Sequence, residues 1–143
     1  MKISLIACSK QEVDFFEELS AALNAVMPDI SVEFFYVPSE LDIPFQAKKV
    51  SGNSDLIAAF YLYSEKNENN AIVLDKLINI ELESNTKILK FFEESSFGEA
   101  LTEEDLQLEK ENIAQKFAEI IVNYLHYPEK FKPEIEEQTE EEL

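Results

Sequence analysis

The chain has 143 residues, of which 45% are hydrophobic, and this is enough to bury the core of one domain. Its formal net charge of −18 disfavours binding to nucleic acid or to an anionic membrane surface, because both depend on basic side chains that meet phosphates. One cysteine cannot form an internal disulfide, and no apolar run is long enough to span a bilayer, so we expect a cytoplasmic protein.

The N-terminal part of the chain predicts a strand, a helix and a second strand. Residues 3–8 form a nearly continuous apolar run, which is typical of a strand buried on both faces of a parallel sheet. Ser9 then opens a capping-box sequence, so we expect a helix over residues 10–27. Residues 30–37 are rich in β-branched and aromatic side chains and predict the second strand.

The middle of the chain continues this alternation. Pro44 has the position of a first-turn proline and predicts a short helix that continues through residues 45–50. Residues 56–63 predict a third strand, and a wide apolar stripe then predicts a helix that ends near Asn85. Residues 87–92 predict a fourth strand that is less apolar on one side and so a candidate edge strand, where Lys87 or Lys90 discourages stray pairing.

The C-terminal part predicts one long helix and a tail. Thr102 opens the helix, and Pro128 closes it. From residue 133 onward there are six Glu and no Lys or Arg, so we expect a single domain over residues 1–132 and an acidic disordered tail over 133–143. The order of strands and helices predicts right-handed crossovers. We therefore expect an α/β three-layer sandwich, with a four-stranded parallel sheet flanked by helices.

The residue types that most often carry catalysis or bind metals are scarce. His126 is the only histidine, and its place in the last turn of a helix favours a structural role beside the helix dipole. Cys8 is the only cysteine, and we interpret it as a buried small hydrophobic residue rather than a nucleophile. A zinc site needs several His or Cys ligands, and a phosphate loop needs more than the two glycines present. We expect no metal and no cofactor.

The most specific local feature is the segment VPSELDIP at residues 37–44, which we call the shelf. It connects the second strand to a helix at the carboxyl edge of the predicted sheet, where open α/β sheets bind their ligands. Its two prolines restrict the backbone, and Asp42 provides a carboxylate between them. The segment therefore predicts a rigid, polar surface beside a binding crevice.

The shelf sequence resembles the VPGAFEIP segment of lumazine synthases and of the related archaeal-type riboflavin synthases. AKKV at residues 47–50 and YPEKF at residues 127–131 extend the similarity to the archaeal type, whose last helix ends in KPEYL. The predicted elements also fall in the same order, so the resemblance spans residues 2–132. It implies a flavodoxin-like topology, a homo-oligomer of five subunits and a ligand bound between neighbouring subunits.

The same resemblance implies a transferase of riboflavin biosynthesis, which would bind a ribityllumazine or a flavin-like ligand. In the family, the loop that corresponds to the shelf holds the ribityl chain through backbone groups and a carboxylate, and Asp42 has the place of that carboxylate here. The ligand-binding positions that the resemblance implies are Ser9, Lys10, Ser39, Glu40, Leu41, Asp42, Tyr63 and Ser64.

The sequence departs from the family at positions that carry chemistry. Lys10 stands where the family has an aromatic residue against the heterocycle. Residues 63–67 stand where lumazine synthases have a glycine-containing phosphate loop and a histidine, and Leu74 and Asp75 stand where the archaeal type has a His-Glu pair. Phosphate binding and proton transfer both lose their usual groups, so the catalytic residues are unassigned.

Three hypotheses follow from the sequence. The first is a divergent riboflavin synthase-like enzyme that dismutates two lumazines mainly by holding their rings together. The second is a catalytically inactive homologue that is retained as an oligomeric binding or structural protein. The third is an acidic interaction module that shares only the α/β scaffold with this family.

Overall fold

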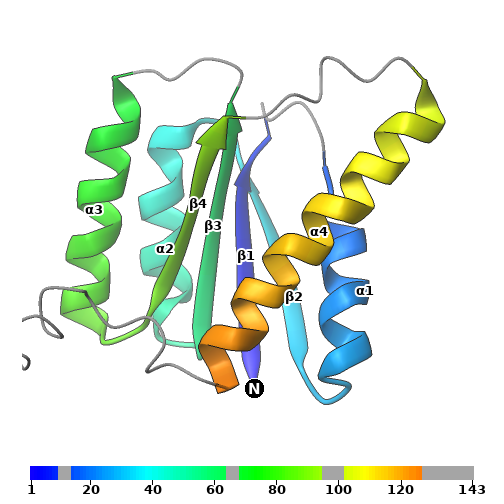
Figure 1. The fold of residues 1–143 in the computed structure, drawn as a ribbon. Helices are drawn as coiled ribbons and strands as arrows, with labels where there is room; N and C mark the ends of the chain where they lie inside the picture. The colour runs from blue at the N-terminus through cyan, green and yellow to red at the C-terminus, as the bar shows by residue number, and fades with distance from the viewer. Residues whose placement is uncertain (10–13, 64–67, 95–101, 127–143) are drawn as a thin grey trace, which may run out of the picture.

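The computed structural model describes residues 1–9, 14–63, 68–94 and 102–126, and Figure 1 shows their arrangement. The predicted tail at residues 133–143 and the YPEKF segment lie outside the described residues. The elements are β1 (Lys2–Cys8), α1 (Phe16–Val26), β2 (Ser31–Val37), the 3₁₀ helix η1 (Glu40–Asp42), α2 (Ile43–Ser51), β3 (Leu56–Tyr63), α3 (Asn69–Ser84), β4 (Ile88–Glu94) and α4 (Glu103–His126).

The four strands form one parallel sheet in the order β2-β1-β3-β4. Helices α1 and α4 cover one face of the sheet and α2 and α3 cover the other, so the chain has three layers (Figure 1). The predicted α/β sandwich with a four-stranded parallel sheet is thus confirmed, as is the position of β4 at one edge. All four strands end at the same edge of the sheet, at the top of Figure 1.

The start of α1 differs from the prediction of a helix over residues 10–27. The helix begins at Phe16, and Phe15 has the non-helical angles φ −120° and ψ 13°. The Asp14 carboxylate accepts a hydrogen bond from the backbone N–H of Phe16 at 3.0 Å, so Asp14 satisfies a donor of the first turn. The start predicted from Ser9 was wrong, because this later carboxylate and the burial of both phenylalanines fix the entry into the helix.

An aromatic cluster forms the core between the sheet and the α1–α4 layer. Phe60 of β3 is fully buried at its centre. Its ring centroid lies 4.9–5.4 Å from those of four other rings, which belong to Phe15, Phe16, Phe91 and Phe117. Aromatic pairs at such distances stabilise a core beyond the area that they bury. The core on the other face, beneath α2 and α3, is mostly aliphatic.

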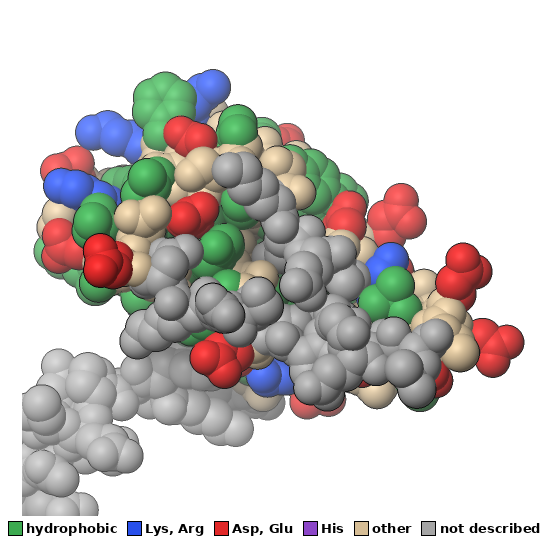
Figure 2. All heavy atoms as spheres, turned by 90° about the horizontal axis from the view of Figure 1, so that it is seen from above, with side chains coloured by type: hydrophobic (Ala, Val, Ile, Leu, Met, Phe, Trp, Pro, Cys, Tyr) green, Lys and Arg blue, Asp and Glu red, His purple; other side chains and the backbone are tan. Residues whose placement is uncertain are grey.

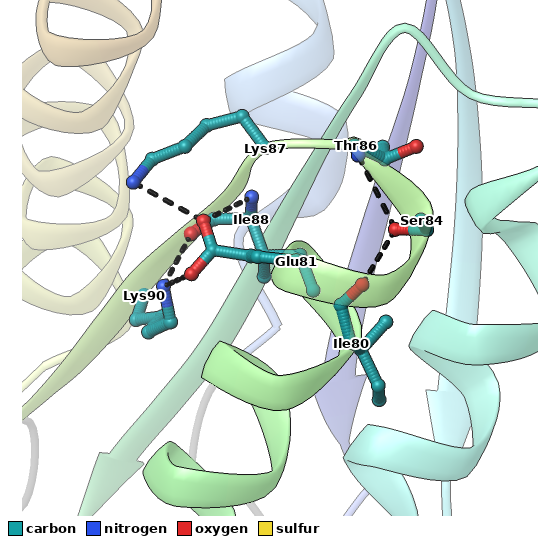
Figure 3. Close-up of polar contacts among 7 residues, drawn as sticks. All are labelled: Ile80, Glu81, Ser84, Thr86, Lys87, Ile88 and Lys90. Atoms are coloured by element: carbon teal, nitrogen blue, oxygen red, sulfur yellow. Dashed lines mark hydrogen bonds and ion pairs between the residues drawn. The ribbon is translucent and has the colours of Figure 1, made fainter.

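A carboxylate of α3 joins this helix to the edge strand β4 (Figure 3). Glu81 accepts hydrogen bonds from the backbone N–H of Ile88 at 3.0 Å and from the ammonium of Lys90, and it forms an ion pair with Lys87 at 3.1 Å. Only 15% of the Glu81 side chain and 17% of the Lys90 side chain are exposed. Burial raises the pKa of Glu81, but the bonds from Lys90, Ile88 and Lys87 outweigh it and hold that pKa below its ordinary value.

Candidate functional site

The shelf contains the single 3₁₀ turn η1 and joins the carboxyl end of β2 to the start of α2. Ser39 has an extended backbone, and its Oγ accepts a hydrogen bond from the N–H of Leu41 at 3.2 Å. The N–H of Asp42 donates to the carbonyl of Ser39 at 3.0 Å, and α2 follows directly with Pro44 in its first turn. A side-chain cap at one end and a proline at the other fix this turn, because both remove backbone freedom.

The shelf turns one side toward the core and the other toward solvent. Ile43 is fully buried among the aliphatic residues beneath α2 and holds the turn in place. Leu41 is 50% exposed, and Asp42 is exposed beside it. The turn therefore exposes an apolar side chain and a carboxylate at consecutive positions. This pair suits a ligand that carries hydroxyl groups next to a hydrophobic ring.

The shelf is tied to the first turn of α3. The side-chain amide of Asn69 donates to Glu40 Oε1 at 3.2 Å, and Ser39 Oγ lies 3.5 Å from Glu40 Oε2. Glu40 is half-buried between them. Of the implied ligand positions, Glu40 thus already holds the shelf against a neighbouring element.

The other implied positions lie at the same edge of the sheet or outside the described residues. The N–H of Ser9 donates to the carbonyl of Val37 at 2.7 Å, which places Ser9 beside the start of the shelf. Tyr63 is half-buried at the end of β3, opposite Glu94 of β4 in the sheet register. Lys10 and Ser64 lie outside the described residues. The structure therefore brings Ser9 close to the shelf and places Tyr63 farther along the same edge.

The Cys8 thiol lies directly behind the shelf. Cys8 is 1% exposed, and its sulfur lies 3.9 Å from the carbonyl oxygen of Pro38. The prediction that it is a buried small residue is confirmed. Since the side chain is packed among aliphatic residues of the core, it supports the shelf sterically rather than facing solvent.

A second polar contact that the sequence analysis missed joins β2 to α1. The Tyr36 hydroxyl donates to Asp14 Oδ2 at 2.7 Å, and the Tyr36 ring lies 5.4 Å from that of Phe16. Burial and then the hydrogen bond to Asp14 raise the pKa of Tyr36 above its ordinary value. The two residues are 22 positions apart, and no sequence spacing indicates such a pair.

Asn70, in the first turn of α3, was also missed by the sequence analysis. Only 2% of Asn70 is exposed, and its Oδ1 has no hydrogen-bond partner among the described residues. A signal was present, because Asn70 precedes Val73 and Leu77 on the apolar stripe at helical spacing. Positions on such a stripe are usually occupied by hydrophobic residues, so a polar residue there predicts a buried polar side chain.

The carboxyl edge of the sheet is acidic in the described part of the chain. Figure 2 looks down onto this edge and shows acidic side chains on several sides of it, with hydrophobic ones between them. Described carboxylates here lie in the turns that lead from a strand into the next helix, at Asp14, Glu40, Asp42 and Glu68, and at the end of β4, at Glu94. Such a surface disfavours a phosphate or another anionic ligand.

Side chains that could bind a metal ion are not assembled in the described residues. Over residues 1–9, 14–63, 68–94 and 102–126, no three His, Cys, Asp or Glu side chains gather as a metal site would require. His126 ends α4 as predicted, at the amino end of the sheet and far from the shelf (Figure 1). Within the same residues, no helix has the length and apolar character that crossing a bilayer requires.

Two surface hollows in the described residues lie away from the shelf. One of about 300 Å³ lies between the end of α1 and the second half of α4, and one of about 230 Å³ lies near the N-terminus. The first is lined by Val26, Gln115, Ala118, Glu119, Val122 and Asn123. Each is lined by a single carboxylate, Glu119 in the first and Asp29 in the second, and neither lies at the carboxyl ends of the strands, so the carboxyl edge remains the better candidate site.

Comparison with known proteins assigns no family. No protein-family model matches the chain, and no curated protein matches it in sequence. The candidate function therefore depends on the likeness of the shelf sequence and on the geometry described above.

Proposed function

We propose that the chain is a divergent riboflavin synthase- or lumazine synthase-like protein that binds a ribityllumazine-type ligand at the carboxyl edge of its sheet. The observation that carries this proposal is the shelf, a capped and proline-bracketed turn that exposes Asp42 beside Leu41. A carboxylate accepts hydrogen bonds from sugar hydroxyls, and an apolar side chain next to it suits the heterocycle.

The same proposal includes a homo-oligomer, because in the family the ligand lies between subunits. A turn that covers only one side of a ligand needs a second surface to exclude water, and a neighbouring subunit would provide it. Light scattering of the purified protein tests this point. We expect a mass five times that of the chain, and a monomer at micromolar concentration would contradict it.

Turnover is tested by supplying the protein with 6,7-dimethyl-8-ribityllumazine and measuring riboflavin fluorescence. If the protein is an enzyme, riboflavin accumulates in proportion to protein concentration, because juxtaposed rings react without a strong side-chain base. If no more riboflavin forms than in a control sample without protein, the hypothesis that the protein is an enzyme is wrong.

A second candidate function is a homologue that binds the same ligand without turnover. The observation that favours it is the place of His126, the only histidine in the chain, at the far end of α4 from the shelf. A histidine is the commonest general base near neutral pH. Ligand binding without riboflavin formation would identify this second function.

The shelf carboxylate is tested by Asp42→Ala. We expect the affinity for 6,7-dimethyl-8-ribityllumazine to fall about tenfold, since a hydrogen bond to a charged acceptor contributes roughly 1.5–3 kcal/mol. Asp29→Ala, at an exposed position between α1 and β2 at the opposite edge of the sheet, is the matched control and should bind as the wild type does. Equal affinity of wild type and Asp42→Ala in isothermal titration would remove Asp42 from the site.

A further inference from the structure

The strand β2 has an unpaired side in the described part of the chain. The sheet order places β2 at the edge opposite β4, and among the described residues only β1 pairs with it (Figure 1). Its seven residues include three aromatic side chains and one charged side chain, that of Glu33. Phe34 is 37% exposed and Tyr36 is 49% exposed. Natural proteins usually protect such an edge, because its unpaired N–H and C=O groups can bond another strand.

The opposite edge of the sheet has the usual protection. Lys87 and Lys90 form ion pairs with Glu81 of α3, and Glu93 pairs with Lys116 of α4. Charged side chains that are held on both faces of an edge strand hinder the approach of another strand. The sequence SVEFFYV of β2 contains neither lysine nor proline, so the two edges differ in what they allow to pair.

The hydrogen bonds at the two ends of β2 show which of its backbone groups point outward. The N–H of Ser31 donates to the carbonyl of Met1 at 2.8 Å, and the carbonyl of Val37 accepts from the N–H of Ser9 at 2.7 Å. Successive residues of a strand direct their backbone groups to opposite sides, so alternate residues from 31 to 37 bond β1. The residues whose N–H and C=O groups point away from the sheet are Val32, Phe34 and Tyr36.

The side chains of these three residues form an apolar row on the face that α1 covers. Val32 packs against the aromatic core, and the ring of Phe16 lies 5.5 Å from that of Phe34 and 5.4 Å from that of Tyr36. The bond from the Tyr36 hydroxyl to Asp14 orients the second ring further. Because these contacts hold the rings in place, a partner loses little affinity to their ordering.

The charges around β2 favour a basic partner. Glu33 lies on the opposite face of the strand and pairs with Lys2 at 2.9 Å, and 46% of its side chain is exposed. Glu17 and Glu18, in the first turn of α1, are close enough to act electrostatically on the Tyr36 hydroxyl. A second copy of the chain would bring a net charge of −18 against these groups, whereas a basic segment complements them.

We propose that the outer side of β2 binds an extended, basic segment of another protein, which adds an antiparallel strand to the sheet. Its apolar side chains lie beside Val32, Phe34 and Tyr36, and basic side chains alternate with them. Backbone hydrogen bonds supply affinity in this mode, and the alternating side chains supply specificity. This inference goes beyond the proposed function and is independent of the ligand at the carboxyl edge.

The test uses the seven-residue peptide Lys-Val-Lys-Val-Lys-Val-Lys, with blocked ends, and the full chain. We expect a dissociation constant of about 10–100 μM by fluorescence anisotropy. The same peptide with N-methyl groups on its three valines keeps its charge but loses the donors that face β2. It should bind at least about tenfold more weakly, and a peptide with Glu in place of Lys should not bind up to about 1 mM.

Substitutions at Phe34 place the peptide on β2. Phe34→Pro removes an outward N–H that β1 does not use, and it should weaken binding at least about tenfold. Phe34→Lys, which repels the peptide from the same position, provides the test if the proline variant does not fold. Leu82→Lys adds the same charge at a side chain of α3 that is 76% exposed, beside the opposite edge, and should bind as wild type. Urea unfolding checks each variant.

The controls separate strand addition from attraction to an acidic surface. Equal affinity of the N-methylated peptide, or of the folded Phe34 variants and Leu82→Lys, would overturn the proposal, as would no binding up to about 1 mM. A doubling of mass of the chain alone that Phe34→Lys abolishes would identify a second copy as the occupant and overturn the basic partner. The titration with 6,7-dimethyl-8-ribityllumazine is unaffected by any of these results, so the proposed function stands or fails separately.

Discussion

Replacement of Phe60 by alanine is expected to lower the free energy of unfolding by about 3–5 kcal/mol, the largest single-residue effect in this chain. The ring is fully buried and lies 4.9–5.4 Å from four others, so its removal leaves a cavity whose rigid aromatic walls relax little. Urea unfolding followed by circular dichroism measures the change.

A matched control for this substitution exists on the surface. Phe45→Ala removes the same ring from a side chain that is 70% exposed and should change stability by less than about 0.5 kcal/mol. Phe60→Leu, with an expected cost of about 1–2 kcal/mol, keeps the test usable if the alanine variant does not fold. Equal effects of Phe60→Ala and Phe45→Ala would contradict the aromatic core.

Removal of the Glu81 carboxylate is expected to have the second largest effect. Glu81→Ala leaves the Lys90 ammonium and the N–H of Ile88 without their acceptor, at a cost of about 2–3 kcal/mol. This is below the cost of breaking a fully buried pair, because 15% of Glu81 and 17% of Lys90 remain exposed. The double variant Glu81→Ala/Lys90→Met should recover much of the loss, and strictly additive effects would contradict the coupling.

The same contact gives stability a definite dependence on pH. The folded-state pKa of Glu81 lies below its ordinary value of 4.5, so its contribution is complete above that value and is lost as the pH falls through the folded-state pKa. The difference in unfolding free energy between wild type and Glu81→Gln should be constant near neutrality and shrink below about pH 4.5. A difference that grows on acidification would contradict this sign.

The framework of the fold could be predicted because local patterns determine it. The apolar run at residues 3–8 forms most of β1 (Lys2–Cys8). Thr102 caps α4, because its Oγ1 accepts a hydrogen bond from the backbone N–H of Asp105 at 3.0 Å. Asn85 ends α3 in the left-handed conformation with φ 59°, which asparagine tolerates better than most residues. Each of these features depends on residues that are neighbours in the sequence.

Features that depend on distant residues could not be predicted. Asp14, at the entry to α1, accepts a hydrogen bond from Tyr36 of β2, which lies 22 residues farther along the chain. Lys90 was predicted to protect a sheet edge, but its ammonium bonds Glu81 and the carbonyl of Ile88, so it mainly joins the edge strand to α3. Such pairs arise when the fold brings separated segments together, and the sequence contains no spacing that indicates them.

The candidate site was predictable only in part, for the same reason. The turn from Ser39 to Asp42 was identified from its prolines and carboxylate, and the structure places it at the carboxyl edge of a parallel sheet. The burial of Asn70 and the bond from Asn69 to Glu40 depend on how α3 docks against η1. Site residues on one loop could therefore be identified, and those contributed by a second element could not.

The most direct test of the account is a calorimetric titration of the full chain with 6,7-dimethyl-8-ribityllumazine. We expect saturable binding with one site per chain and a dissociation constant in about the micromolar range. The reason is that the shelf exposes a carboxylate and an apolar side chain, which can contact the ribityl chain and the heterocycle. No binding up to about 1 mM ligand would contradict the central claim that this turn forms part of a ribityllumazine site.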